Sequence, residues 1–230
     1  FGYTDGATIS NLGFAGDVTG DDEVGGLIGQ ADETTVTNSW ATGSVTGGDD
    51  YVGGLIGESV NSTITGSWAT GSVTGNEYVG GLIGKSVNST ITGSWATGSV
   101  TGDDDEDDYV GGLIGESVNS TITGSWATGS VTGDDDVGGL IGQADETTVT
   151  NSWATGSVTG DDDYVGGLIG EADGSAISDS WASGNVSGDG DTAGLIGHLD
   201  SSTLSNSYAL GNVTGGQDGD DDIGGLVGQI

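Results

Sequence analysis

The chain of 230 residues contains no cysteine, proline, methionine or arginine, and Lys85 is its only lysine. Without cysteine, neither disulfides nor thiolate metal ligands support the fold. No apolar run approaches the roughly 20 residues of a membrane-spanning helix. Against the single Lys stand 36 Asp and Glu, for a formal net charge of -35. Nucleic acid and anionic membranes are therefore excluded as partners, because binding them relies on clustered Lys and Arg. Any charged partner must be a cation.

Groups for catalysis are equally scarce, since the chain has one His, one Lys and no Arg or Cys. Paired carboxylates can hydrolyse glycosides, but the Asp and Glu here recur in repeated loops and do not converge on one cleft. His198 stands where other repeats carry Gln30, Glu58 or Lys85, which indicates a variable surface position. Because an active site needs convergent groups with distinct roles, we expect no enzyme.

The sequence is instead a tandem repeat. The segment GGLIG or a close variant occurs eight times, with its Leu residues 27 to 31 residues apart, and an aromatic residue follows each of the first seven Leu by 13 residues. All variation in length falls in the acidic stretch that precedes GGLIG. Insertions confined to one place mark a loop on one edge of a regular stack. The repeated Leu are Leu27, Leu55, Leu82, Leu113, Leu140, Leu168, Leu195 and Leu226.

Each repeat offers three short β-prone runs: VGGLIG, then TTVT or STIT, then WATGSVTG. Val, Ile and Thr favour strands, and Gly interrupts the runs too often for a helix. We predict an all-β fold, a single parallel β-solenoid of about eight coils of 27–31 residues with about three short strands per coil. In this division 1–24 is a divergent partial coil, 25–222 holds seven repeat units and 223–230 begins an incomplete coil.

Strand alternation predicts which side chains face the core. In Thr63-Ile64-Thr65 it places Ile64 inward and both threonines outward. Val73 has a different phase, so the chain must turn a corner near Trp68, whose ring lies either inside that corner or outside it. Stacking of coils about 4.8 Å apart should align identical residues into ladders of Trp, of Ile and Val, of Thr and of acidic side chains.

The unit GGLIG, followed by a short polar loop and then T-[IV]-T-[GN]-S-W-A-T-G-S-V-T-G, resembles the GLUG repeat family of bacterial and archaeal surface proteins, including adhesins. This resemblance implies an extracellular location and an adhesive or spacer role. It supplies no catalytic residues. The acidic loops depart from the average member and resemble proteins of halophiles, in which acidic surfaces hold hydration in molar salt.

The acidic edge is the most informative chemical feature. Like charges about 5 Å apart cost roughly 0.8 kcal/mol per pair in bulk water, so the stacked carboxylates must be screened by salt or neutralised by bound Ca²⁺ or Mg²⁺. Solvated halophilic loops and specific cation binding are the two interpretations. The candidate metal ligands are Asp103, Asp104, Asp105, Asp107, Asp108, Asp134, Asp135, Asp136, Asp161, Asp162 and Asp163.

Two further repeated features have a structural and a functional interpretation each. The Trp residues either stabilise the stack or form an exposed strip for stacking on sugar rings; they are Trp40, Trp68, Trp95, Trp126, Trp153 and Trp181. Five Asn-x-Ser/Thr sequons are either turn residues or N-glycosylation sites; they begin at Asn61, Asn88, Asn119, Asn185 and Asn212.

We therefore expect a non-enzymatic extracellular structural or adhesive protein, a surface adhesin or stalk of a halophilic microbe, whose partner is a cell-surface or matrix component. The alternative is a self-assembling filament or viral fibre subunit, because both ends of the solenoid look open and solenoids normally cap their edges. A minor alternative is an ice-binding solenoid, in which the outward Thr rows would contact ice.

Overall fold

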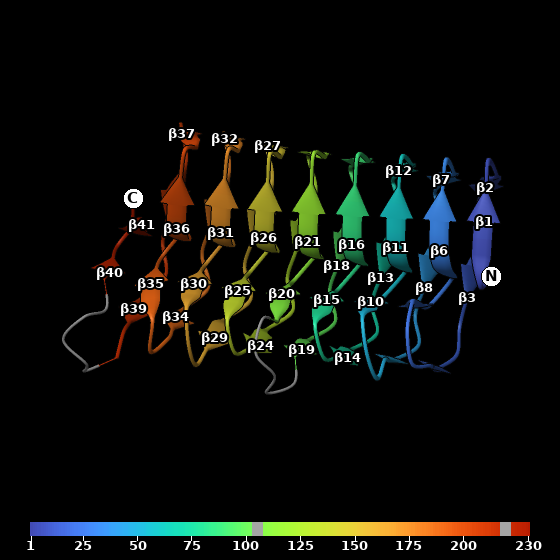
Figure 1. The fold of residues 1–230 in the computed structure, drawn as a ribbon, viewed down its shortest axis with the longest axis horizontal. Coiled ribbons are helices and arrows are strands. Elements are labelled where there is room, and N and C mark those ends of the chain that lie inside the picture. The colour runs from blue at the N-terminus through green and yellow to red at the C-terminus, as the bar shows by residue number, and fades with distance from the viewer. Residues whose placement is uncertain (103–107, 217–221) are drawn as a thin grey trace.

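The computed structural model describes residues 1–102, 108–216 and 222–230. Within these ranges the chain forms 41 β-strands and no helix. No helix long and apolar enough to cross a membrane occurs in the described part. The strands wind into one elongated stack of coils, with the N-terminus at one end and the C-terminus at the other (Figure 1). The predicted all-β parallel solenoid of about eight coils is confirmed.

Each complete coil contributes five short strands, one to each of five parallel sheets, which we name A to E in the order in which the chain meets them. The prediction of about three strands per coil is wrong, because two of the three β-prone runs bend at glycines. At Gly71 a Cβ atom would lie 1.9 Å from the carbonyl oxygen of Gly43, and at Gly53 it would lie 1.8 Å from that of Ile56. Only glycine fits such close approaches, and each bend divides one run into two strands.

Sheet A carries the longest strands, and sheet B follows it across a sharp corner. Sheet A consists of β1 (Tyr3–Asp5), β6 (Ile28–Asp32), β11 (Ile56–Val60), β16 (Ile83–Val87), β21 (Ile114–Val118), β26 (Ile141–Asp145), β31 (Ile169–Asp173), β36 (Ile196–Asp200) and β41 (Val227–Gln229). Sheet B consists of β2 (Thr8–Ser10), β7 (Thr35–Thr37), β12 (Thr63–Thr65), β17 (Thr90–Thr92), β22 (Thr121–Thr123), β27 (Thr148–Thr150), β32 (Ala176–Ser178) and β37 (Thr203–Ser205).

Sheets C and D derive from the WATGSVTG run. Sheet C consists of β3 (Gly13–Phe14), β8 (Trp40–Ala41), β13 (Trp68–Ala69), β18 (Trp95–Ala96), β23 (Trp126–Ala127), β28 (Trp153–Ala154), β33 (Trp181–Ala182) and β38 (Tyr208–Ala209). Sheet D consists of β4 (Val18–Thr19), β9 (Val45–Thr46), β14 (Val73–Gly75), β19 (Val100–Gly102), β24 (Val131–Gly133), β29 (Val158–Gly160), β34 (Val186–Ser187) and β39 (Val213–Thr214).

Sheet E completes the coil and leads back into sheet A through the Gly-Leu bend. It consists of β5 (Val24–Gly25), β10 (Tyr51–Gly53), β15 (Tyr78–Gly80), β20 (Tyr109–Gly111), β25 (Asp136–Gly138), β30 (Tyr164–Gly166), β35 (Asp191–Ala193) and β40 (Ile223–Gly224). The acidic stretches lie between sheets D and E, at one edge of the stack (Figure 1).

Coils pair residue for residue, which aligns identical side chains as expected. Ile64, for example, pairs with Val36 on one side and Ile91 on the other. Ile64 is fully buried, whereas Thr63 is exposed and Thr65 is half-buried. One core column of Leu, Ile and Ala, with Val36 and Val149, runs beneath sheets A, B and C. A second column consists of valines from sheets D and E.

The corners are stabilised by serine ladders. The Ser94 hydroxyl donates to the carbonyl of Thr92 at 3.2 Å and accepts the amide of Ser67 in the preceding coil at 3.2 Å. Ser67 and Ser125 repeat this arrangement in the neighbouring coils. The Thr92 carbonyl also accepts the amide of Gly66, so what the buried hydroxyl prevents is an unsatisfied Ser67 amide at the corner.

Candidate functional site

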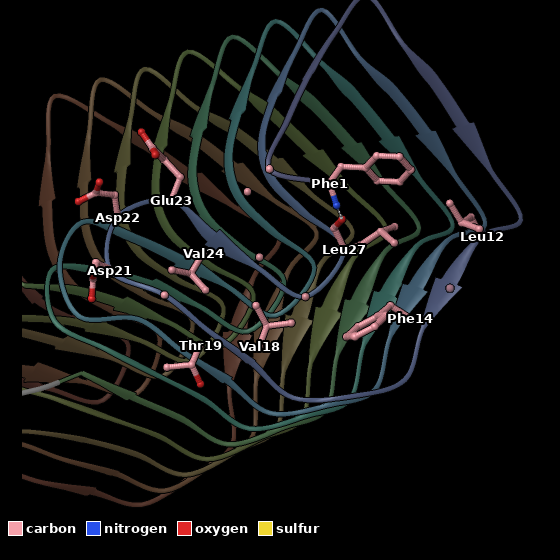
Figure 2. A pocket seen from close by; sticks show the side chains of 16 residues that line it. Phe1, Leu12, Phe14, Val18, Thr19, Asp21, Asp22, Glu23, Val24 and Leu27 are labelled. Carbon is pink, nitrogen blue, oxygen red and sulfur yellow. Dashed lines mark hydrogen bonds between the residues drawn. The ribbon is translucent and has the colours of Figure 1, made fainter.

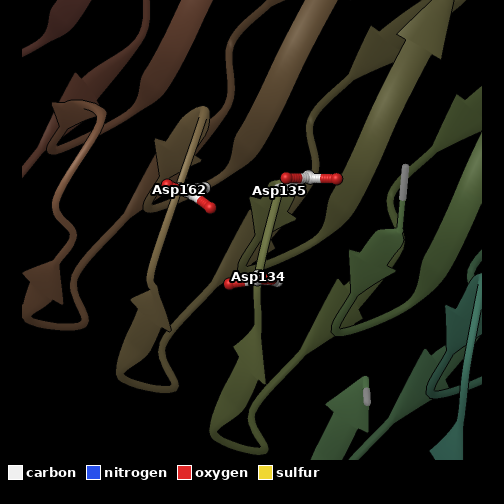
Figure 3. A group of neighbouring side chains, drawn as sticks. All are labelled: Asp134, Asp135 and Asp162. Carbon is white, nitrogen blue, oxygen red and sulfur yellow. The ribbon is translucent and has the colours of Figure 1, made fainter. Parts of the chain in front are cut away.

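Three carboxylates of the acidic edge converge from two consecutive coils. Asp134 and Asp135 lie between β24 and β25, and Asp162 lies between β29 and β30 (Figure 3). One oxygen from each lies within 4.8 Å of the other two. Asp162 is exposed, and the other two residues are half-buried. Carboxylate oxygens are the ligands that Ca²⁺ and Mg²⁺ take in proteins, so this group can contribute to a cation site.

Asp108 supports the same loop from within the stack. Its side chain is fully buried, and its two oxygens accept the backbone amides of Asp135 at 2.9 Å and Asp134 at 3.4 Å. Burial raises the pKa of Asp108 to about 7, although these two hydrogen bonds act in the opposite direction. Asp108 is therefore a positioning group for the loop.

Asp136 is the second buried carboxyl, and it occupies a position that neighbouring coils give to tyrosine. It pairs with Tyr109 on one side and Tyr164 on the other within sheet E. Its side chain is only 5% exposed. Burial raises the pKa of Asp136 to about 9, and the nearby carboxylates, with Glu171 and Asp163 foremost, act in the same direction.

A cavity of about 140 Å³ lies beside Asp136. Its lining residues come from sheets A and E and from the loops before β25 and β30; they are Tyr109, Asp135, Asp136, Gln143, Asp163, Tyr164 and Glu171. Four of these seven residues are acidic. The candidate site is therefore an acidic cavity between two sheets, and Asp135 belongs both to it and to the exposed group of Figure 3.

The polar row of sheet A faces the aromatic row of sheet E. Lys85 forms an ion pair with Glu116, and its Nζ lies 4.7 Å from the ring centre of Tyr78. Further along, the Gln143 amide donates to Glu171 at 2.7 Å, and His198 Nδ1 lies 3.3 Å from the other oxygen of Glu171. His198 is thus half-buried in this row, where it also contacts the Tyr164 ring, and is not a freely exposed surface residue.

The predicted metal ligands therefore lie in different surroundings. Asp103, Asp104, Asp105 and Asp107 lie outside the described residues. Asp134, Asp135 and Asp162 come together, whereas Asp135, Asp136 and Asp163 line the cavity. Asp108 binds backbone amides, and Asp161 is exposed and belongs to neither group. Sequence reasoning missed Gln143 and Glu171, which the spacing from GGLIG would have aligned in one row.

Two stretches of the stack match a known repeat model. They are residues 75–101 and 135–159, which match the GLUG motif. These two stretches are GLUG repeats. The second match includes Asp135, Asp136 and Gln143, so part of the acidic cavity lies within a GLUG unit. No curated protein matches the chain significantly.

The Trp ladder of sheet C lies outside the apolar core and is half-buried. From Trp68 to Trp181 successive ring centres are 4.9 to 5.3 Å apart, and the ring planes differ by 1° to 9°. Each internal indole therefore stacks on two others, which gives the ladder a stabilising role. Since the ring faces meet one another, a sugar approaching the side of the ladder would meet ring edges. Sugar stacking on the strip stays a prediction.

Three of the five sequon asparagines are corner residues. Asn61, Asn88 and Asn119 have φ of 48° to 49° and lie between sheets A and B. Asn tolerates this left-handed conformation better than most residues, which accounts for its place in the repeat. Asn185 and Asn212 precede sheet D, and the Asn212 amide nitrogen Nδ2 donates to Asn185 Oδ1 at 3.2 Å. All five are exposed, and glycosylation stays a prediction.

The Thr rows and the coil ends are the remaining exposed features. The first Thr of each triplet is exposed from β7 to β27, and Ala176 interrupts that row in β32. At the N-terminal end, a cavity of about 730 Å³ is lined by Phe1, Leu12, Phe14 and neighbouring residues of the first coil (Figure 2). The C-terminal coil likewise exposes apolar side chains, namely Tyr208, Leu210, Ile223, Leu226 and Ile230.

Proposed function

We propose that this chain is a non-enzymatic, extracellular structural element, a surface adhesin or stalk of a halophilic microbe. The observation that supports it most directly is the unbroken register of the coils combined with acidic loops that vary in length only between sheets D and E. The ladders give a rod whose length is set by coil number. The acidic edge then provides a hydrated, variable surface for contacts with a cell-surface or matrix component.

The net charge of -35 supports the halophilic setting. At 0.1 M salt the Debye length is about 10 Å, so carboxylates in neighbouring coils repel each other almost fully, whereas at 1 M it is about 3 Å. We expect the free energy of unfolding to rise as NaCl is raised from 0.1 to 2 M, measured by urea unfolding. An unchanged unfolding midpoint would contradict the halophilic part of the proposal.

The surface role is tested on cells of the source microbe. Antibodies raised against the purified chain should label intact cells, and cells that lack the gene should attach less to their substratum or to one another. Labelling that appears only after permeabilisation would exclude the surface location. Normal attachment of the deletion strain would exclude adhesion and leave the spacer role.

A second candidate is end-to-end association, which the exposed apolar ends favour. Phe1, Leu12 and Phe14 at one end and Leu210 and Leu226 at the other are at least 40% exposed. Either a further coil of the same polypeptide or the end coil of a second copy would bury them. Electron microscopy of the purified chain tests the second case, in which filaments with an axial repeat of one subunit are expected. Isolated short rods over a wide concentration range would rule it out.

A further inference from the structure

The tyrosine row of sheet E contains one acidic residue with an aromatic residue on both sides. Glu23, Asp136, Asp191 and Asp222 all stand in this row, but only Asp136 lies between two tyrosines, Tyr109 and Tyr164. A carboxyl group is much smaller than a phenol ring. The replacement therefore leaves space beside Asp136, and the 140 Å³ cavity occupies that position.

Asp136 is also the group in this cavity that most needs a partner. Asp136 is only 5% exposed. In the described part of the chain no hydrogen bond to its carboxyl group is present. The charged groups that act on it are Glu171, Asp163, Asp135 and Asp108, all of the same sign. Buried carboxylates are normally paired or bound to a metal. The side chain lines the cavity, so a ligand there would meet it directly.

We propose that this cavity binds one Ca²⁺ ion, with carboxylate oxygens of Asp135, Asp136, Asp163 and Glu171 as its protein ligands. The Nε2 group of Gln143 donates to Glu171, and Gln143 also lines the cavity, so its side-chain carbonyl oxygen is a candidate for a further ligand. Ca²⁺ takes six to eight oxygen ligands in flexible geometry. The cavity has the volume of about four to five waters at roughly 30 Å³ each, enough for the ion with water completing its shell.

Calcium fits this donor set better than magnesium. Mg²⁺ demands near-ideal octahedral geometry, keeps several waters and is usually held by one or two carboxylates. Here four carboxylates from two sheets and two loops line one cavity. No three of them bring oxygens within 4.8 Å of one another, so the side chains must close on the ion, which suits a larger ion with a variable coordination number. The group of Asp134, Asp135 and the exposed Asp162 (Figure 3) shares Asp135 with the cavity and gives the ion a negatively charged approach from solvent.

The site goes beyond the surface role proposed above and does not depend on it. Other coils fill the same row with tyrosine, as at Tyr51, Tyr78 and Tyr109. In the coil of Tyr78 the facing position carries Lys85, which supplies the positive charge itself. Asp191 lies in the same row but is not part of the cavity lining, and its carboxylate accepts the amide of Asp222 at 2.8 Å. We therefore expect one such site within the described residues 1–102, 108–216 and 222–230.

The experiment is a calorimetric titration of the full 230-residue chain with CaCl₂ after treatment with EDTA, at fixed NaCl. Three variants are compared: Asp136→Asn, which keeps the shape, Asp136→Tyr, which restores the row, and Asp191→Asn, which removes the same charge outside the cavity. We expect one saturable site in the wild type and in Asp191→Asn. Both Asp136 variants should lose more than about tenfold in affinity, since even outer-shell partners of metals are worth that much.

Terbium luminescence gives an independent readout, because Tb³⁺ replaces Ca²⁺ and Tyr109 and Tyr164 line the cavity as sensitisers. The wild type should show saturable luminescence that Ca²⁺ displaces, and Asp136→Tyr should not. Circular dichroism checks that the variants remain folded. If Asp136→Tyr does not fold, Asp136→Asn still tests the site. No saturable binding in the wild type, or equal affinity in Asp136→Asn and Asp191→Asn, would overturn the proposal.

Discussion

Replacing Asp136 by Asn should stabilise the cation-free protein at neutral pH. Folding buries this carboxyl among four other acidic residues and raises its pKa to about 9 from an ordinary 3.8. At pH 7 the folded state must hold a proton that the unfolded state has released. At about 1.4 kcal/mol per pH unit this costs up to about 4 kcal/mol. Asn has the same shape and needs no proton, so the variant avoids the cost.

The sign of the pH dependence follows from the raised pKa. Below about pH 4 the carboxyl is protonated in both states, and wild type and Asp136→Asn should have similar stability. Between pH 4 and about 9 only the unfolded state releases the proton, so the wild type loses stability steadily relative to the variant. Asp108, whose pKa is raised to about 7, acts in the same direction over pH 4 to 7, but it is present in both proteins and cancels.

The assay is urea unfolding followed by tryptophan fluorescence at intervals from pH 4 to pH 9, with EDTA and constant NaCl. Asp49→Asn serves as the control, because Asp49 is an exposed residue of the acidic edge. Adding Ca²⁺ at 100 times its Kd should narrow the difference, since it stabilises the wild type by about 2.7 kcal/mol and stabilises the more weakly binding Asp136→Asn by less. A difference between wild type and Asp136→Asn that is zero or independent of pH would refute the reasoning.

Three other predictions concern the scaffold and use the same unfolding assay. Ile91→Ala should cost about 2 to 5 kcal/mol and Ile91→Val only about 1, because the row already holds valines; equal losses would contradict tight packing in that column. Ser94→Ala should cost about 1 to 3 kcal/mol, because it leaves the buried backbone amide of Ser67 without a partner, whereas the exposed Ser99→Ala should be neutral; a neutral Ser94→Ala would show that the serine ladder does not stabilise the corners. Gly71→Ala should destabilise more than any surface change, because its Cβ would lie 1.9 Å from the carbonyl oxygen of Gly43; a native unfolding midpoint would show that the coils separate easily.

The period of the repeat was enough to predict the solenoid, because residues at constant spacing from GGLIG must align when coils stack. The inward position of Ile64 and the outward position of Thr63 follow from strand alternation alone. The number of strands could not be obtained in the same way. Whether Gly71 continues a strand or bends it depends on its approach to Gly43 in another coil, and a local propensity does not contain that contact.

The position of the tryptophans shows a second limit of the sequence. Alternation gives a side chain's face only within one strand, and Trp68 follows a corner at Gly66, whose φ is +57°. The corner resets the phase, so the ring lies outside while the adjacent Ala69 is buried. The serine ladders were missed for a related reason. Ser67 and Ser94 recur at a fixed spacing, but their role depends on amides freed by the corners.

The acidic residues likewise show that neighbouring positions in the sequence can have different surroundings in the structure. Asp134, Asp135 and Asp136 are adjacent and cannot be distinguished in the sequence. In the structure Asp136 is buried in the tyrosine row, whereas Asp134 and Asp135 are half-buried in the loop. What separates them is the start of β25 at Asp136, which fixes that side chain opposite Gln143 and Glu171. Copies of a repeat share their scaffold, so a departure from the shared residue at a fixed position changes the surroundings of only that coil. For this reason Asp136, which replaces a tyrosine between two tyrosines, is a better guide to a specific site than the long acidic runs, whose side chains water can hydrate in any coil.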